Sequence, residues 1–156
     1  MSIIAFIAAW FLLVPIALVL VAVATSADRR EALIEAALAG VATVALVKTG
    51  GLLYAHSRPF VVHHVLPLVA HGADNSFPSD HAAAAGLAVA YLWPRSRTAA
   101  VVALVAGLAI GAARVAAQLH WPVDVVAGFA FGIAGGLAAF VITRRLAPSA
   151  LPGGAS

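Results

Sequence analysis

Long uninterrupted stretches of apolar residues constrain this 156-residue chain more than any other feature. A bilayer core about 30 Å thick is crossed by roughly 20 apolar residues in a helix. Runs of about that length begin near Ile3, Ala32, Thr98 and Val123, and a shorter run follows His81. Backbone polar groups must be hydrogen-bonded inside a bilayer, so such runs form helices. The pattern therefore predicts an all-α, integral membrane helical bundle of about five transmembrane helices.

The composition leaves little material for anything other than such a bundle. Hydrophobic residues make up 63% of the chain, charged residues 10%, and the mean hydropathy is +1.05, whereas soluble domains are roughly half apolar and a quarter charged. The absence of cysteine excludes disulfides and thiolate metal sites. We expect a single transmembrane domain over residues 1–156, with a loose Pro-, Gly- and Ser-rich tail at about 147–156.

The ends of the runs set the expected spans. Met1 and Ser2 carry no positive side chain, so we interpret the first run as a retained span and not as a signal peptide. The third run is short and crosses only with its ends in the interfaces. The five predicted spans are Ile3 to about Thr25, Ala32 to Ala55, Ser79 to Trp93, Thr98 to about Leu119, and Val123 to Thr143.

Three basic doublets predict the orientation of the bundle. They lie at alternate ends of the spans, and therefore on one side of the membrane: Arg29 with Arg30, Arg95 with Arg97, and Arg144 with Arg145. By the positive-inside rule that side is cytoplasmic. The N-terminus is then outside, the C-terminus is cytoplasmic, and residues 56–80 and 120–124 share the outer face. All six histidines fall in or next to these two outer segments.

Three cations are not explained by topology. Lys48 and Arg114 lie toward the outer ends of spans, and Arg58 lies in the long outer segment. Charged side chains within spans usually face a bundle interior or a wet cavity. The alternative for Lys48 and Arg114 is snorkelling, with the charge in the interface and the stem along lipid. The alternative for Arg58 is an ordinary solvated loop arginine.

Polar motifs accompany these cations on the predicted outer face. They are Arg58-Pro59, the string SFPSDHA at residues 76–82, and Arg114 followed by His120 and Asp124. Taken singly, the second can be a helix cap and the third a local hydrogen bond. Together and in this order they resemble the signature of the type 2 phosphatidic acid phosphatase superfamily, roughly KxxxxxxRP, PSGH and SRxxxxxHxxxD. The strings RPFV and NSFPSDHA are most similar to those of the bacterial undecaprenyl-diphosphatases.

The chain departs from that signature at three positions. Gly51 stands where the superfamily has its lysine, and Lys48 lies one helical turn earlier. Either Lys48 reaches the phosphate from an altered register, or the site works without that lysine. Ala113 replaces the serine before Arg114, which removes a hydroxyl donor. Asp80 replaces the glycine of PSGH, which places a carboxylate near an anionic substrate but also suits a helix start.

These residue types fit phosphoryl transfer, which needs a nucleophile, a proton for the leaving oxygen and positive charge around the phosphate. Arginines offer planar donor forks that match phosphate geometry. A neutral imidazole can attack phosphorus when its other ring nitrogen donates to a fixed acceptor. From this chemistry and the resemblance we assign His120 as the nucleophile that forms a phosphohistidine, Asp124 as its orienting acceptor, His81 as the general acid, and Arg58, Arg114, Ser79 and Lys48 as phosphate-binding residues.

The remaining histidines are expected to play smaller parts. His56, His63, His64 and His71 are interpreted as loop side chains in water or at the headgroup level. A histidine-cluster metal site is the competing idea, because zinc and copper accept imidazole. The spacing is irregular and no glutamate lies nearby, so we expect no metal site. The resemblance likewise implies no cofactor.

The sequence thus leads to one main hypothesis and two alternatives. The main one is a multi-pass phosphatase of the bacterial plasma membrane that hydrolyses the terminal phosphate of undecaprenyl diphosphate at the outer leaflet. A phosphatidate, phosphatidylglycerophosphate or other lipid-phosphate phosphatase is the runner-up. The third is a non-catalytic transporter or assembly subunit with a polar pathway. The expected partners are a lipid phosphate and membrane lipids, with no nucleic acid; the sequence makes no prediction of an oligomer.

Overall fold

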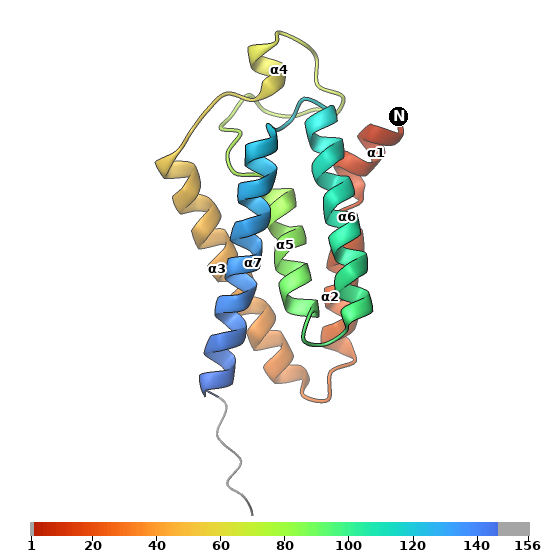
Figure 1. Ribbon diagram of the computed structural model, residues 1–156, viewed down its shortest axis with the longest axis vertical. Coiled ribbons are helices and arrows are strands. Elements are labelled where there is room, and N and C mark those ends of the chain that lie inside the picture. The colour runs from red at the N-terminus through yellow and green to blue at the C-terminus, as the bar shows by residue number, and fades with distance from the viewer. Residues whose placement is uncertain (1, 147–156) are drawn as a thin grey trace, which may run out of the picture.

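The computed structural model describes residues 2–146 and is all-helical over that range, as predicted (Figure 1). Within these residues, the only β-type pairing is an isolated antiparallel bridge between Ser57 and Asn75. The predicted tail at 147–156 lies outside the described residues. The helices are α1 (Ile3–Trp10), α2 (Leu13–Ala24), α3 (Arg29–Leu53), α4 (Pro59–Val62), α5 (Asp80–Leu92), α6 (Arg97–Ala116) and α7 (Pro122–Leu146).

Local sequence explains where several helices begin and break. Asp28, Ser79 and Ser96 cap α3, α5 and α6, because each side-chain oxygen accepts a hydrogen bond from the third following backbone N–H. The first predicted span is broken at Phe11 between α1 and α2. Pro15 accounts for the break, since a proline ring clashes with the carbonyl four residues earlier.

Four helical segments within residues 2–146 are long and apolar enough to cross a membrane: Ile3–Ala24, Arg29–Leu53, Arg97–Ala116 and Pro122–Leu146. The third predicted span, Ser79 to Trp93, corresponds to α5, which has 13 residues. That helix is mostly buried and packs against α2, α3, α6 and α7. The other helices therefore surround α5, and the number of membrane crossings stays a prediction.

Close packing of α5 against α7 depends on glycine. A Cβ atom added to Gly128 would collide with the carbonyl oxygen of Ser79, and one added to Gly132 would collide with that of Ala83. Small residues at such positions let helix backbones approach closely. The contact holds the start of α5, with His81, beside the start of α7, with Asp124.

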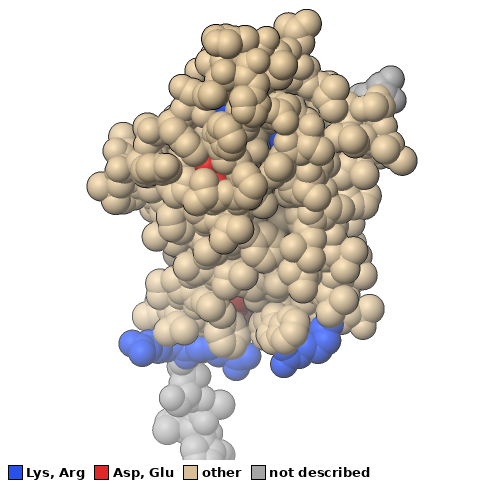
Figure 2. Space-filling model, turned by 45° about the horizontal axis from the view of Figure 1, so that its top comes forward, with Lys and Arg blue, Asp and Glu red and all other residues tan. Residues whose placement is uncertain are grey.

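The basic doublets lie together at one end of the bundle, as their spacing predicts. They occupy the start of α3, the turn from α5 to α6, and the last turn of α7, all at the lower end in Figure 1. Figure 2 shows this as a blue rim, with little charge on the visible surface above it. The six histidines lie toward the opposite end, around α4 and the loops. Which end faces the cytoplasm stays a prediction.

Candidate active site

A cavity of about 430 Å³ opens at the end of the bundle opposite the basic rim. Its walls come from the end of α3, the start of α4, the loop before α5, and the ends of α5 and α6 that meet there. The predicted site residues that line it are Lys48, Arg58, His81, Arg114 and His120. Five side chains separated by up to 72 positions in sequence thus converge on one space.

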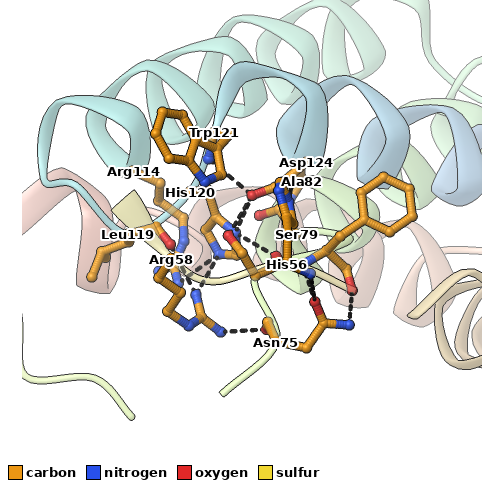
Figure 3. A network of polar contacts seen from close by, with 12 residues as sticks. His56, Arg58, Asn75, Ser79, Ala82, Arg114, Leu119, His120, Trp121 and Asp124 are labelled. Atoms are coloured by element: carbon orange, nitrogen blue, oxygen red, sulfur yellow. Dashed lines mark hydrogen bonds and ion pairs between the residues drawn. The ribbon is translucent and has the colours of Figure 1, made fainter. Parts of the chain in front are cut away.

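His120 lies between two guanidinium groups (Figure 3). Its Nε2 is 3.4 Å from Nη1 of Arg58 and 3.3 Å from Nη2 of Arg114. On the other side of the ring, Nδ1 is 2.9 Å from the backbone oxygen of Ser76. A carbonyl only accepts and a guanidinium only donates, so this network assigns the proton to Nδ1 and a lone pair to Nε2.

The surroundings of His120 keep its ring neutral. Burial, followed by the positive charges of Arg114 and Arg58, lowers the pKa of His120 to about 3, against the opposing effect of Asp124. The imidazole is therefore unprotonated at neutral pH. A neutral ring with its Nε2 lone pair facing two cations is the form required for attack on phosphorus.

The two arginines differ in how completely their donors are used. Arg58 donates from Nη1 to the oxygen of Leu119 (2.9 Å), from Nη2 to that of Asn75 (3.2 Å), and from Nε to Asp74 (2.9 Å). Arg114 donates from Nη1 to the oxygen of Ala8 at 3.1 Å, next to the α1–α2 break, but its buried Nε has no partner within residues 2–146. Arg114 thus has one buried donor that no described residue satisfies, whereas every donor nitrogen of Arg58 has a partner.

Lys48 and Gly51 share one face of α3, three residues apart, and both line the cavity. The loop before α5 packs directly on Gly51, where an added Cβ would lie 3.1 Å from the oxygen of Phe77. Asn75 also donates to the Gly51 carbonyl at 3.1 Å. A side chain at position 51 would press on this loop, whereas Lys48 is exposed and reaches the cavity one turn away. The geometry is compatible with the altered register.

Ser79 is completely buried and does not line the cavity. Its hydroxyl accepts from the N–H of Ala82 as the cap of α5, and its own N–H donates to the oxygen of Asp124 at 3.0 Å. The structure thus places Ser79 behind the site, where it joins α5 to α7. Its contact with a phosphate stays a prediction.

Asp124 lies behind His120, but its shortest contacts are with other groups. Its Oδ2 is 3.5 Å from Nδ1 of His120, farther than the Ser76 oxygen that the ring meets first. The carboxylate accepts from the N–H of Trp121 at 2.8 Å and from the hydroxyl of Ser76, and it contacts Nε2 of His56 at 2.7 Å. Asp124 therefore holds the loop whose carbonyl orients the ring, as well as facing the ring itself.

Three residues of this network were not identified from sequence. Ser76 supplies the carbonyl for His120, and His56 contacts the buried side of Asp124. Asn75 ties the loop together, because its Oδ1 accepts from the N–H groups of His56 and Phe77. Asn75 and Ser76 belong to the string NSFPSDHA, but the sequence alone assigned them no role. Hydrogen bonds to backbone oxygens and contacts within a loop do not follow from the spacing of residue types along the chain.

The other histidines are placed differently from one another. The His81 ring lines the cavity and makes no hydrogen bond within residues 2–146, which leaves it free for a substrate oxygen. His71 also lines the cavity, with its Nε2 3.2 Å from Nη2 of Arg114. Burial, followed by the charge of Arg58, lowers the pKa of His71.

The remaining loop histidines lie away from the cavity lining. His63 contacts Gln118 at 2.7 Å and His64 is exposed. No group of three or more metal-binding side chains gathers within residues 2–146.

Comparison with known proteins identifies relatives of this chain. The sequence profile of the PAP2 superfamily matches residues 31–147, which include all the cavity residues named above. The undecaprenyl-diphosphatase BcrC of Bacillus subtilis is 34% identical over 120 residues, covering 76% of this chain and 62% of that protein. A lipid A 1-phosphatase of Rhizobium etli is 36% identical over 80 residues, covering 49% of this chain and 33% of that protein.

The chain spans about three fifths of the length of the curated relatives that it matches over the longest stretches. Its fold is similar to that in the crystal structure of LpxE from Aquifex aeolicus, with a TM-score of 0.68 at 21% identity. That similarity covers 88% of this chain and 81% of the other. The shared fold therefore covers more of the chain than the matched profile does.

Proposed function

Because the chain belongs to the PAP2 superfamily, as its motifs predict, we propose that it is a membrane phosphatase that releases the terminal phosphate of undecaprenyl diphosphate. The observation that carries the proposal is the neutral His120, whose Nε2 faces Arg58 and Arg114 inside one cavity. A dense set of cations around a nucleophile suits a substrate with two adjacent phosphates. The 34% identity to BcrC supports this choice of lipid.

The reaction proceeds in two steps. Nε2 of His120 attacks the terminal phosphorus, a P–N bond forms, and the bond to the bridging oxygen breaks. His81 gives a proton to the departing undecaprenyl phosphate, while Arg58, Arg114 and Lys48 neutralise the phosphoryl oxygens. His81 then takes a proton from water, which attacks the phosphohistidine and releases inorganic phosphate. The proton stays on Nδ1 and is donated to the Ser76 carbonyl throughout, and Asp124 stabilises the positive ring that forms.

The proposed location follows from the charge pattern. If the basic rim faces the cytoplasm, the cavity opens at the outer leaflet of a bacterial plasma membrane. A lipid diphosphate at that leaflet can then place its headgroup in the cavity without leaving the bilayer. Its product is the monophosphate carrier used in cell-wall synthesis. No cofactor is part of the proposal.

A second candidate substrate class is supported by the match to lipid A 1-phosphatase. In that case the same His120 would attack a phosphate monoester, and the leaving group would be a sugar oxygen instead of a phosphate. Such a leaving group depends more heavily on proton donation by His81. Phosphatidate and phosphatidylglycerophosphate belong to the same monoester class.

A substrate panel tests the proposal. Purified full-length protein in detergent is given undecaprenyl diphosphate, phosphatidate, phosphatidylglycerophosphate and lipid A, and inorganic phosphate is measured with and without chelator. We expect fastest release from undecaprenyl diphosphate and no effect of chelator. Faster release from a monoester would replace the proposed substrate. No release from any of the four would overturn the phosphatase in favour of a non-catalytic membrane protein.

A further inference from the structure

A second hollow continues from the catalytic cavity down the side of the bundle. It lies between α3 and α5, has a volume of about 440 Å³, and shares Val47, Lys48 and Asp80 with the cavity. The two charged residues lie at this junction. Below them the shared wall becomes apolar, so one continuous surface leads from the phosphate-binding end toward the level of the membrane interior.

Small and aliphatic side chains form this groove between α3 and α5. Gly40, Thr43 and Val44 line it on α3, and Ala83, Ala84 and Leu87 line it on α5. Gly40 lies seven residues below Val47, or about 10 Å along the helix. A Cβ atom added to Gly40 would have no neighbour within 4 Å. The groove is therefore open at this glycine, and a larger side chain there would fill it.

A larger apolar groove lies on another side of the bundle, between α6 and α7. Its volume is about 750 Å³, and its lining includes Leu108, Val126 and Ala130. This groove shares no lining residue with the catalytic cavity. A lipid chain resting there would not lead to His120. Continuity with the cavity, and not size, therefore distinguishes the groove between α3 and α5.

We propose that the groove between α3 and α5 binds the hydrocarbon tail of the lipid phosphate substrate, an inference that rests on the proposed function. The headgroup then enters past Lys48, and the proximal part of the tail lies along Val47, Val44 and Gly40. Membrane lipid is as apolar as the groove, so burial of the tail adds little affinity. The groove acts by shape: it admits a slender chain beside small residues and orients the phosphates toward His120.

Substitutions that fill the groove test this inference. Gly40→Leu places a branched side chain in open space and replaces a residue that disfavours helix, so α3 should still form. Ala84→Leu narrows the facing wall. The matched control is Ala130→Leu, which makes the same change in the unconnected groove between α6 and α7. Each protein is assayed in detergent with undecaprenyl diphosphate and with isopentenyl diphosphate, whose single isoprene unit does not reach Gly40.

For undecaprenyl diphosphate we expect kcat/KM to fall about tenfold in Gly40→Leu and Ala84→Leu, and to stay unchanged in Ala130→Leu. Rates with isopentenyl diphosphate should stay the same in all variants. Equal kcat/KM values for Gly40→Leu and Ala130→Leu on the long substrate would overturn the proposed tail-binding groove, since only bulk lipid would then occupy it. Wild-type protein that hydrolyses neither substrate would overturn the proposed function itself.

Discussion

Arg95 at the basic rim and the two arginines of the cavity are held in different ways. At the basic rim, Arg95 forms a two-point ion pair with the buried Glu35, at 2.9 and 3.0 Å. Thr143 donates to the same carboxylate, and the Arg95 guanidinium lies 3.8 Å from the centre of the Tyr91 ring. Two parallel contacts to one carboxylate balance the charge of Arg95 within the protein. This ion pair and Thr143 join α3, the turn after α5, and α7.

At the cavity, the arginines are not matched in this way. Arg114 faces neutral rings and a backbone carbonyl, and its Nε has no partner within the described residues. Arg58 does pair with Asp74, but that carboxylate is 70% exposed and therefore screened by water. The guanidinium groups of Arg58 and Arg114 beside His120 are thus placed to bind an anion in the cavity. The contrast indicates that the paired charge of Arg95 serves the fold, whereas the proposed role of Arg58 and Arg114 is to bind an anion.

The largest expected effect is a loss of activity on substitution of His120 at the cavity end. His120→Asn removes the proposed nucleophile, so phosphate release should fall on the order of 10⁴-fold. The loop variant His64→Asn is the control, because His64 is exposed and asparagine tolerates its positive φ of 54°. Both should keep the thermal unfolding midpoint of the wild type. Full turnover by His120→Asn would refute the nucleophile and place the reaction elsewhere.

A change at the basic rim should do the opposite. Glu35→Gln leaves Arg95 without its counter-charge and should lower the free energy of unfolding by about 2 kcal/mol. Because no substrate reaches this end, kcat per folded molecule should stay the same. Thermal unfolding in detergent and active-site-normalised rates measure the two quantities. A loss of kcat at unchanged stability would contradict the division between the ends.

Acid should destabilise the protein through the cavity end. The folded state keeps His120 neutral, with a pKa of about 3, whereas the unfolded chain takes up a proton near pH 6.5. The unfolded state thus binds more protons below pH 6.5, and stability falls as the pH falls. This one group should cost about 1–2 kcal/mol between pH 7.5 and pH 5. Unfolding midpoints measured at both pH values should show a smaller difference in His120→Asn than in the wild type.

The smallest expected effect concerns the shifted lysine. Lys48 is an exposed point charge at the mouth of the cavity, so Lys48→Ala should reduce kcat/KM by about threefold, mainly through KM. Lys48→Arg should restore most of the loss because it keeps the charge. A complete loss of turnover in Lys48→Ala would show that Lys48 fully replaces the lysine that the superfamily has at the position of Gly51.

Much of the cavity could be predicted because its side chains carry spaced motifs. Arg58, His81, Arg114 and His120 were named from the sequence, and all four line one space. Ser79 also stands within a motif, but its burial and its capping contact with α5 follow from how closely α5 meets α7. The motif specified the residue type at that position, and the packing of the two helices decided what the side chain touches.

The sequence by itself determined the helical membrane architecture, the alignment of the basic doublets and the family. The helices follow from the apolar runs, and the alignment of the doublets follows from their spacing along the chain. Only the tertiary structure decided that the Ser76 carbonyl meets His120, that Ala8 holds Arg114 from 106 positions away, and that one of two grooves reaches the cavity. The first two contacts use backbone oxygens, which every residue has, and the groove is a space between helices. Neither can therefore be recognised from the residue types in a sequence.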